Sequence, residues 1–172
     1  DHVVTTPYSW GASTSCILHQ NAIPIFADVD KYTGLIDPKQ IEARITPRTR
    51  AILVVHIFSH PADMTSIMRI AKKHDLVVVE DGSQAHGATW KGVGVGDFGH
   101  ANGFSCMGGK QLASTEAGYM VTPDEDVYLV GRNLMLLSKA GVFCAVNGIG
   151  RIAVGPLAGN LFPDATAEFF SV

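Results

Sequence analysis

The sequence predicts an α/β fold in which a mostly parallel sheet lies between two layers of helices. From the start to about residue 122, short apolar runs rich in β-branched residues alternate with segments of helical character. The runs are apolar on both faces, which is typical of parallel strands that are covered by helices on both sides. We therefore expect a three-layer α/β/α arrangement.

The expected elements follow one another along the chain. Apolar runs predict strands at residues 3–5, 23–29, 51–58 and 76–79. Helical character is found in three segments, residues 10–20, 38–45 and 62–74. Residues 127–139 could form a further helix, whereas residues 142–159 are rich in glycine and apolar residues and have no clean period.

Composition excludes several classes of protein. The 172 residues are 47% hydrophobic with a mean hydropathy of +0.19, which rules out a disordered chain. The net charge is −3 and no basic run is present, so we expect no nucleic-acid partner. The apolar runs are too short to cross a bilayer and no signal peptide is visible, so we expect no membrane partner. The three cysteines include no C-x-x-C pair, which favours a reducing cytoplasm over disulfides or structural zinc.

Two patterns resemble functional motifs but are interpreted differently. Gly94, Gly96 and Gly99 match G-x-G-x-x-G, yet no strand directly precedes them and no helix follows, so we expect a connecting loop rather than a nicotinamide site. His56 and His60 are four residues apart at the end of a strand pattern, and the glutamate of an H-E-x-x-H metal site is missing. We expect no metal there, although His56 emerges at the edge of the sheet and is a candidate for lining a substrate pocket.

A combination of four residues carries the strongest chemical signal. Asp81 ends a buried-type strand, where a carboxylate needs a cationic or proton-donating partner, and Ser105 and Lys110 follow another apolar run. Taken singly, Asp81 would be a turn or capping residue and Lys110 a surface lysine. With Trp10 they supply a lysine for a Schiff base, an acid for a pyridine nitrogen, a hydroxyl for a phosphate and a flat ring for stacking. A pyridoxal-phosphate enzyme needs these four parts.

At these residues the sequence resembles the DegT family of sugar aminotransferases, which are fold-type I pyridoxal-phosphate enzymes. The similarity runs from about Val3 to about Thr122. It is carried by residues 6–10 (TPYSW), 25–30 (IFADVD), 45–52 (ITPRTRAI) and, most specifically, 79–88 (VEDGSQAHGA). The resemblance implies that the chain is part of the large domain of such an enzyme.

The family likeness also implies a role for each site residue. Asp81 would pair with the pyridine nitrogen of pyridoxal 5′-phosphate, and Gln84 would lie near the ring hydroxyl. Ser105 would bind the phosphate, and Lys110 would form the internal aldimine and act as the proton-transferring base. Trp10 would stack on the cofactor ring.

The reaction implied is transfer of an amino group from glutamate or glutamine to a keto-sugar or keto-cyclitol, by a homodimer, in antibiotic or polysaccharide biosynthesis. The sequence departs from the family where residues 115–118 read TEAG instead of Gly-Glu-Gly-Gly, and residues 148–152 only loosely match a segment that contributes to the neighbouring subunit's site. The alternative is a truncated or divergent, non-catalytic relative that retains the fold as a binding or assembly module.

Family members are longer than this chain, so we expect it to be an interior piece of a larger protein. Residues 1–140 would then be part of the cofactor-binding large domain. Residues 141–172 would lead toward a small C-terminal domain that the chain lacks, and the piece alone would be inactive.

Overall fold

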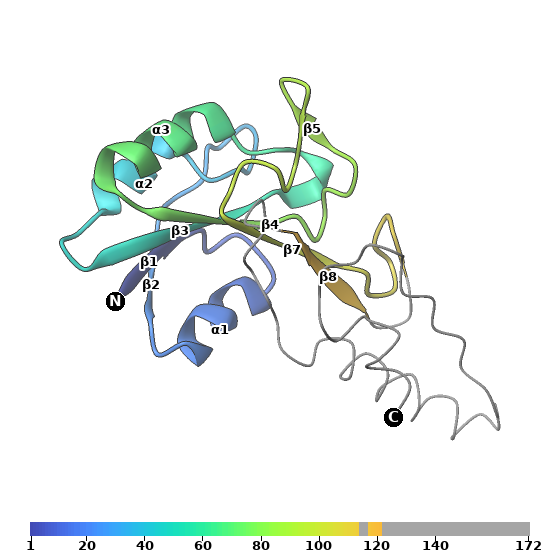
Figure 1. Cartoon of the computed structure of the whole chain (residues 1–172), viewed down its shortest axis with the longest axis horizontal. Coiled ribbons are helices and arrows are strands. Elements are labelled where there is room, and N and C mark those ends of the chain that lie inside the picture. The colour runs from blue at the N-terminus through green and yellow to red at the C-terminus, as the bar shows by residue number, and fades with distance from the viewer. Residues whose placement is uncertain (114–116, 122–172) are drawn as a thin grey trace, which may run out of the picture. The chain divides into compact units, whose positions relative to one another are not determined.

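A six-stranded sheet forms the centre of the computed structural model, which describes residues 1–113 and 117–121 (Figure 1). The strand order is β2-β1-β3-β4-β7-β8, and every neighbouring pair is parallel except β7 and β8. The strands are β1 (His2–Thr5), β2 (Ile23–Phe26), β3 (Thr49–Val55), β4 (Val77–Asp81), β7 (Ala101–Ser105) and β8 (Gly118–Val121). The prediction of a mostly parallel sheet is confirmed.

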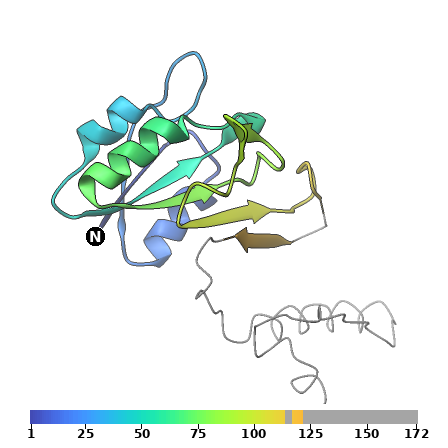
Figure 2. The same cartoon turned by 45° about the horizontal axis from the view of Figure 1, so that its top comes forward.

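Helices cover both faces of this sheet (Figures 1 and 2). They are α1 (Ala12–His19), α2 (Pro38–Arg44) and α3 (Met64–His74). Helix α1 lies on one face, whereas α2 and α3 lie together on the other, as both views show. The expected three-layer α/β/α arrangement is therefore confirmed.

Helix α3 forms where the sequence gives it both an apolar face and end signals. Its buried residues recur at helical spacing and are Met64, Ile67, Ile70 and Ala71. At its start, the carboxylate of Asp63 accepts a hydrogen bond from the backbone N–H of Ser66 at 3.1 Å. At its end, Asp75 adopts a left-handed conformation that stops the helix. This end directs the chain back into β4.

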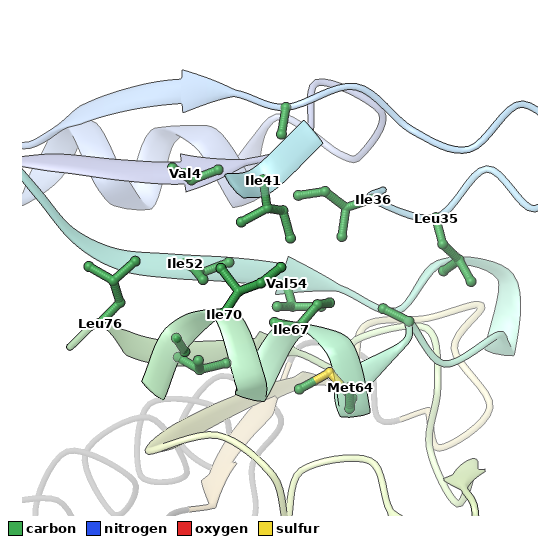
Figure 3. Packing of buried hydrophobic residues seen from close by; sticks show 14 of the residues in the cluster. Val4, Leu35, Ile36, Ile41, Ile52, Val54, Met64, Ile67, Ile70 and Leu76 are labelled. Carbon is green, nitrogen blue, oxygen red and sulfur yellow. The ribbon is translucent and has the colours of Figure 1, made fainter. Parts of the chain in front are cut away.

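The largest hydrophobic cluster lies between the sheet and helices α2 and α3 (Figure 3). Ile52 and Val54 of β3 point into it and pack with Ile41 and Ile67 of the two helices. Because side chains alternate along a strand, the intervening residue Leu53 lies on the opposite face, toward α1.

The register of the sheet carries this alternation into β4, the strand that ends in two acids. Val54 pairs with Glu80, and Val55 pairs with Asp81. Glu80 therefore lies on the face covered by α2 and α3, whereas Asp81 lies on the face covered by α1. Consecutive carboxylates thus belong to different layers of the molecule.

The structure shortens two of the expected strands. The run at residues 23–29 ends as a strand at Phe26, and the run at 51–58 ends at Val55. The apolar composition of the second run extends past Val55 because Ile57 is also buried. Residues 57–59, however, form a short 3-10 turn, η1 (Ile57–Ser59), rather than a strand. A small hairpin of β5 (Thr89–Trp90) and β6 (Val93–Gly94) and the strand β8 were not expected, since each is too short to show a period.

The C-terminal part of the expectations lies outside the described residues. The chain divides into one unit of Asp1–Glu125 and a second of Asp126–Val172. The possible helix at residues 127–139 and the expected change of domain near residue 140 fall in the second unit, so both stay predictions.

Candidate functional site

The functional residues expected from the sequence gather where parallel strands end. Strands β1, β3, β4 and β7 run in the same direction, so their carboxyl ends meet at one edge of the sheet. Asp81 is the last residue of β4, and Ser105 is the last residue of β7. Such an edge is where α/β proteins form their binding sites.

Asp81 is held by hydroxyl and amide donors on the α1 side of the sheet. Its Oδ2 accepts a hydrogen bond from Ser13 Oγ at 2.7 Å, and its Oδ1 accepts one from the backbone N–H of Ser83 at 3.1 Å. Because the Ser13 hydrogen is directed at Asp81, Ser9 Oγ donates in the 2.7 Å bond between the two serines. This chain of donors orients the carboxylate.

The half-buried Asp81 carboxylate forms no ion pair with any side chain that the structure describes. A carboxylate at the end of a buried strand is best satisfied by a cationic donor, and each of its oxygens has a further lone pair to offer. A protonated pyridine ring would supply that donor. The residues present at this edge therefore fit the pyridinium side of pyridoxal phosphate.

Lys110 lies in the turn that follows β7. Ser105 Oγ accepts from the Met107 N–H at 3.3 Å, and the backbone N–H of Lys110 bonds to the carbonyl of Met107 at 3.1 Å. Gly109, directly before the lysine, has a φ of +91°, a left-handed conformation that glycine adopts at little cost. A glycine at this position thus matches the local backbone.

Trp10 and Gln84 lie in the loops beside these residues. Trp10 lies two residues before the start of α1, is 76% exposed, and its carbonyl accepts the Ser13 N–H at 3.0 Å. Gln84 Oε1 accepts the backbone N–H of Phe58 at 3.1 Å, so this side chain also ties two loops together. Hydrogen bonds thus join Trp10 to Asp81 through Ser13.

His56 is placed in the core rather than in a pocket, which corrects the expectation from sequence. It is 0% exposed, its Nδ1 accepts the N–H of Ala62 at 3.0 Å, and its Nε2 lies 2.9 Å from Glu80 Oε2. Because Nδ1 is an acceptor, the ring carries its proton on Nε2 and donates it to Glu80. Both nitrogens are therefore occupied, and His56 holds protein segments together instead of lining a substrate site.

Glu80 uses the same network to anchor the glycine-containing loop. Its carboxylate accepts the backbone N–H groups of Gly96 at 3.1 Å, Phe98 at 3.0 Å and Gly99 at 2.6 Å. Burial alone raises the pKa of this carboxyl, but the hydrogen bonds from His56 and from the Gly99 and Gly96 amides outweigh burial and hold the pKa below its ordinary value. No helix opens between β6 and β7, as predicted, but Gly94 lies in the short strand β6, whereas the sequence predicted no strand directly before these glycines.

Three polar residues of the site were not identified from the sequence. Ser9 and Ser13 orient Asp81, and Gln111 bridges loops beside Lys110. Ser13 lies in the first turn of α1 and Ser9 lies just before that helix, and their place next to Trp10 is the one signal that could have indicated them. Gln111 gave no signal, because its partners are distant in sequence.

The described residues contain neither a membrane-spanning helix nor a cluster of metal ligands. No helix among them is long and apolar enough to cross a membrane. Within residues 1–113 and 117–121, no three His, Cys, Asp or Glu side chains come together as a ligand set for a metal ion.

The fold and this edge define a class of protein. A mostly parallel α/β/α domain with an acid at the end of a central strand and a lysine after the next strand is typical of the large domain of fold-type I, pyridoxal-phosphate-dependent aminotransferases, and solved aminotransferases share this fold. Residues 1–143 match the sequence model of the DegT/DnrJ/EryC1/StrS aminotransferase family, so the chain belongs to this family. The resemblance expected from the sequence motifs is confirmed.

Solved structures share this fold over most of the chain. An aminotransferase from Psychrobacter cryohalolentis superposes with a TM-score of 0.72 and 36% identity, covering 94% of this chain and 41% of that one. NtdA from Bacillus subtilis, solved with its cofactor PMP bound, gives a TM-score of 0.68 and 32% identity over 73% of this chain and 28% of its own.

Several curated relatives are named as aminotransferases of inososes. The chain is 46% identical to the L-glutamine:2-deoxy-scyllo-inosose aminotransferase of Streptomyces fradiae over 127 residues, which are 74% of this chain. It is also 46% identical to the L-glutamine:scyllo-inosose aminotransferase of Streptomyces griseus over 134 residues, or 78% of this chain. The matched part spans 30% and 32% of these relatives, about a third of their length.

Proposed function

We propose that the whole protein is a pyridoxal-phosphate-dependent aminotransferase that moves an amino group from glutamine to the ketone of a cyclitol. The observation that supports it best is Asp81, an oriented carboxylate with no cationic partner among the described residues, at the edge where Lys110 also lies. The names of the inosose aminotransferases favour glutamine over glutamate and a cyclitol over a nucleotide-linked keto-sugar.

Each residue of the site has a distinct task in this proposal. When bound, pyridoxal phosphate supplies an aldehyde that takes up the amino group and a protonated ring that withdraws electrons from the reacting carbon. Asp81 would hold the proton on the ring nitrogen, and Ser9 and Ser13, which orient its carboxylate, would keep it turned toward that nitrogen. Trp10 would lie against the ring face, and Gln84 near its hydroxyl.

Lys110 and Ser105 complete the binding machinery. The Lys110 amine would link to the cofactor aldehyde and, once displaced by the donor, move a proton to and from the reacting carbon through Nζ. Positioned proton transfer of this kind accelerates a reaction by about 10²–10⁴-fold. Ser105, at the end of β7, would donate its hydroxyl to the phosphate, which it is free to do because its Oγ acts as an acceptor toward Met107.

The setting of the enzyme is part of the proposal. We place it in the cytoplasm, because Cys16 and Cys106 are free thiols in the structure. We also propose a homodimer in which residues 148–152 serve the neighbouring subunit's site, with residues 1–140 as the large domain of each subunit.

Trapping of the cofactor tests this function. The full-length protein mixed with pyridoxal phosphate should develop visible absorbance that borohydride removes, and peptide mass spectrometry should then find the cofactor on Lys110. Lys110→Ala should abolish the trapped adduct, whereas Lys72→Ala, which changes an exposed lysine of α3, should leave it intact. An adduct that persists in Lys110→Ala would refute the lysine assignment.

Product analysis separates the enzyme from a non-catalytic relative. Incubation with glutamine and scyllo-inosose should give the corresponding amino-cyclitol, and glutamate should support a slower reaction. A protein that binds the cofactor but aminates neither cyclitol ketones nor keto-sugars would favour the binding or assembly module.

A further inference from the structure

Gln111, the residue after Lys110, joins three segments of the carboxyl edge. Its Nε2 donates to Ser59 Oγ and, at 2.8 Å, to the carbonyl oxygen of Gln84. Its Oε1 lies 3.3 Å from Nδ1 of His86. Both donor hydrogens and the amide oxygen are therefore engaged, each with a different part of the chain.

The first of these segments is under backbone strain. Phe58 and Ser59 have φ values of +53° and +63°, a left-handed conformation that costs free energy in residues with a Cβ atom. Gln84 Oε1 accepts the N–H of Phe58, and Gln111 bonds to the hydroxyl of Ser59. The two strained residues are thus each bonded by a glutamine side chain, Phe58 by Gln84 and Ser59 by Gln111.

The carbonyl of Gln84 fixes the orientation of the Gln111 amide, because a carbonyl oxygen can only accept and the NH₂ group must therefore face it. Because Nε2 of Gln111 is directed at Ser59 and Gln84, its Oε1 faces His86, and the imidazole must donate from Nδ1. The ring packs against Phe104, with 5.4 Å between ring centroids, so it cannot turn freely. The Gln84 carbonyl therefore selects the amide orientation, and the packed His86 ring donates to the amide oxygen.

We propose that Gln111 is a positioning residue that holds the Lys110 segment against the Gln84 loop and the strained 57–59 turn, and so sets where the lysine amine lies. The role of the lysine rests on the proposed function, whereas the holding of the three segments does not. Since Gln84 lies only three residues after Asp81, Gln111 holds the lysine segment against the loop that directly follows the acid. A leucine at this position would fill a similar volume and form none of the bonds.

Hydrogen exchange in the cofactor-free, full-length protein tests the holding role directly. Gln111→Leu should speed exchange of the amides of Phe58, His60 and Lys110 by about tenfold, the loss expected for removing one or two neutral hydrogen bonds. Gln20→Leu is the matched control, because Gln20 is exposed at the end of α1 and its side chain is far in sequence from this network. Unchanged exchange at all three amides in Gln111→Leu would overturn the proposal.

A second measurement addresses the lysine. In Gln111→Leu the rate at which pyridoxal phosphate becomes trapped on Lys110 should fall about tenfold. Gln111→Glu keeps an acceptor for His86, so its trapping rate should lie between those of the unaltered protein and Gln111→Leu. An unchanged trapping rate in Gln111→Leu would overturn the positioning of the amine. If the unaltered protein forms no adduct on Lys110, the proposed function fails, and the exchange experiment still decides whether Gln111 holds the three segments.

Discussion

Replacing Glu80 with glutamine perturbs the buried network most cleanly, because the shape of the side chain is kept while one acceptor becomes a donor. In the native protein Oε2 accepts from His56 and Gly96, and Oε1 accepts from Phe98 and Gly99. A glutamine can present its oxygen to only one of these pairs, and its NH₂ group must then face two other donors. Reversing the His56 tautomer does not help, because Nδ1–H would then face the N–H of Ala62.

The expected loss of stability follows from counting the donors left without an acceptor. Each buried donor that loses its partner costs about 1–3 kcal/mol, so two of them cost about 2–6 kcal/mol. Glu80 and His56 are 1% and 0% exposed, so water cannot replace the lost bonds. A typical domain unfolds with only about 5–15 kcal/mol, so this loss is a large part of the total.

Urea unfolding of the cofactor-free protein, followed by circular dichroism, measures the difference in unfolding free energy. The folded-state pKa of Glu80 is lowered, so the carboxylate stabilises the protein above its unfolded-state pKa of about 4.3, and this contribution is lost as the pH falls through the folded-state value. The difference between the unaltered protein and Glu80→Gln should therefore be full at neutral pH and should shrink below about pH 4. Glu42→Gln, at an exposed carboxylate bonded to Lys73, is the control and should change stability little.

Two results would refute this reasoning. Glu80→Gln could prove as stable as the unaltered protein at neutral pH, which would mean that the four donors do not need a charged acceptor. Alternatively, the difference in unfolding free energy between the two proteins could stay constant below about pH 4. That result would mean that losing the charge of Glu80 is not the cause of the lower stability of the variant.

Three further changes have distinct expected outcomes. Asp81→Asn should keep the fold, because an amide can still bond to its neighbours, but should lower amino transfer from glutamine by at least about 100-fold; near-normal turnover would exclude the role of the acid. Gly99→Ala should lower the unfolding free energy by about 1–3 kcal/mol, since a Cβ would lie 2.8 Å from the Val78 carbonyl oxygen, whereas Gly103→Ala, with open space around it, should be tolerated. Trp10→Ala should leave stability within about 0.5 kcal/mol, because the ring is 76% exposed, and should raise the dissociation constant for pyridoxal phosphate in a spectral titration; an unchanged constant would exclude stacking.

The sequence was sufficient to predict the layers of the fold and the edge at which the chemistry lies. Apolar runs and helical periods are local signals, and the carboxyl-edge rule then places Asp81 and Ser105 together. A lone aspartate or lysine has many uses, so Asp81 and Lys110 carry little information singly. They became a candidate site only when they were considered together as the groups that a pyridoxal-phosphate cofactor requires. Their specific roles stay predictions.

Where the prediction failed, the missing information was three-dimensional. His56 follows a strand that ends at the functional edge, but its ring turns into the core to meet Glu80, which is 24 residues away in the sequence. Gln111 donates a hydrogen bond to Ser59, which is 52 residues away in the sequence. Hydrogen bonds between side chains on different loops have no periodic signature, so neither pairing can be read from the residues alone.

The opposite orientation of Glu80 and Asp81 has a consequence for protein engineering. One pleat of β4 separates a residue that secures the scaffold from a residue that faces the proposed cofactor site, although a single peptide bond joins them. A library that randomises position 81 together with the α1-side serines would explore new chemistry on an intact framework. The same library moved by one position would return chains selected mainly for their ability to fold.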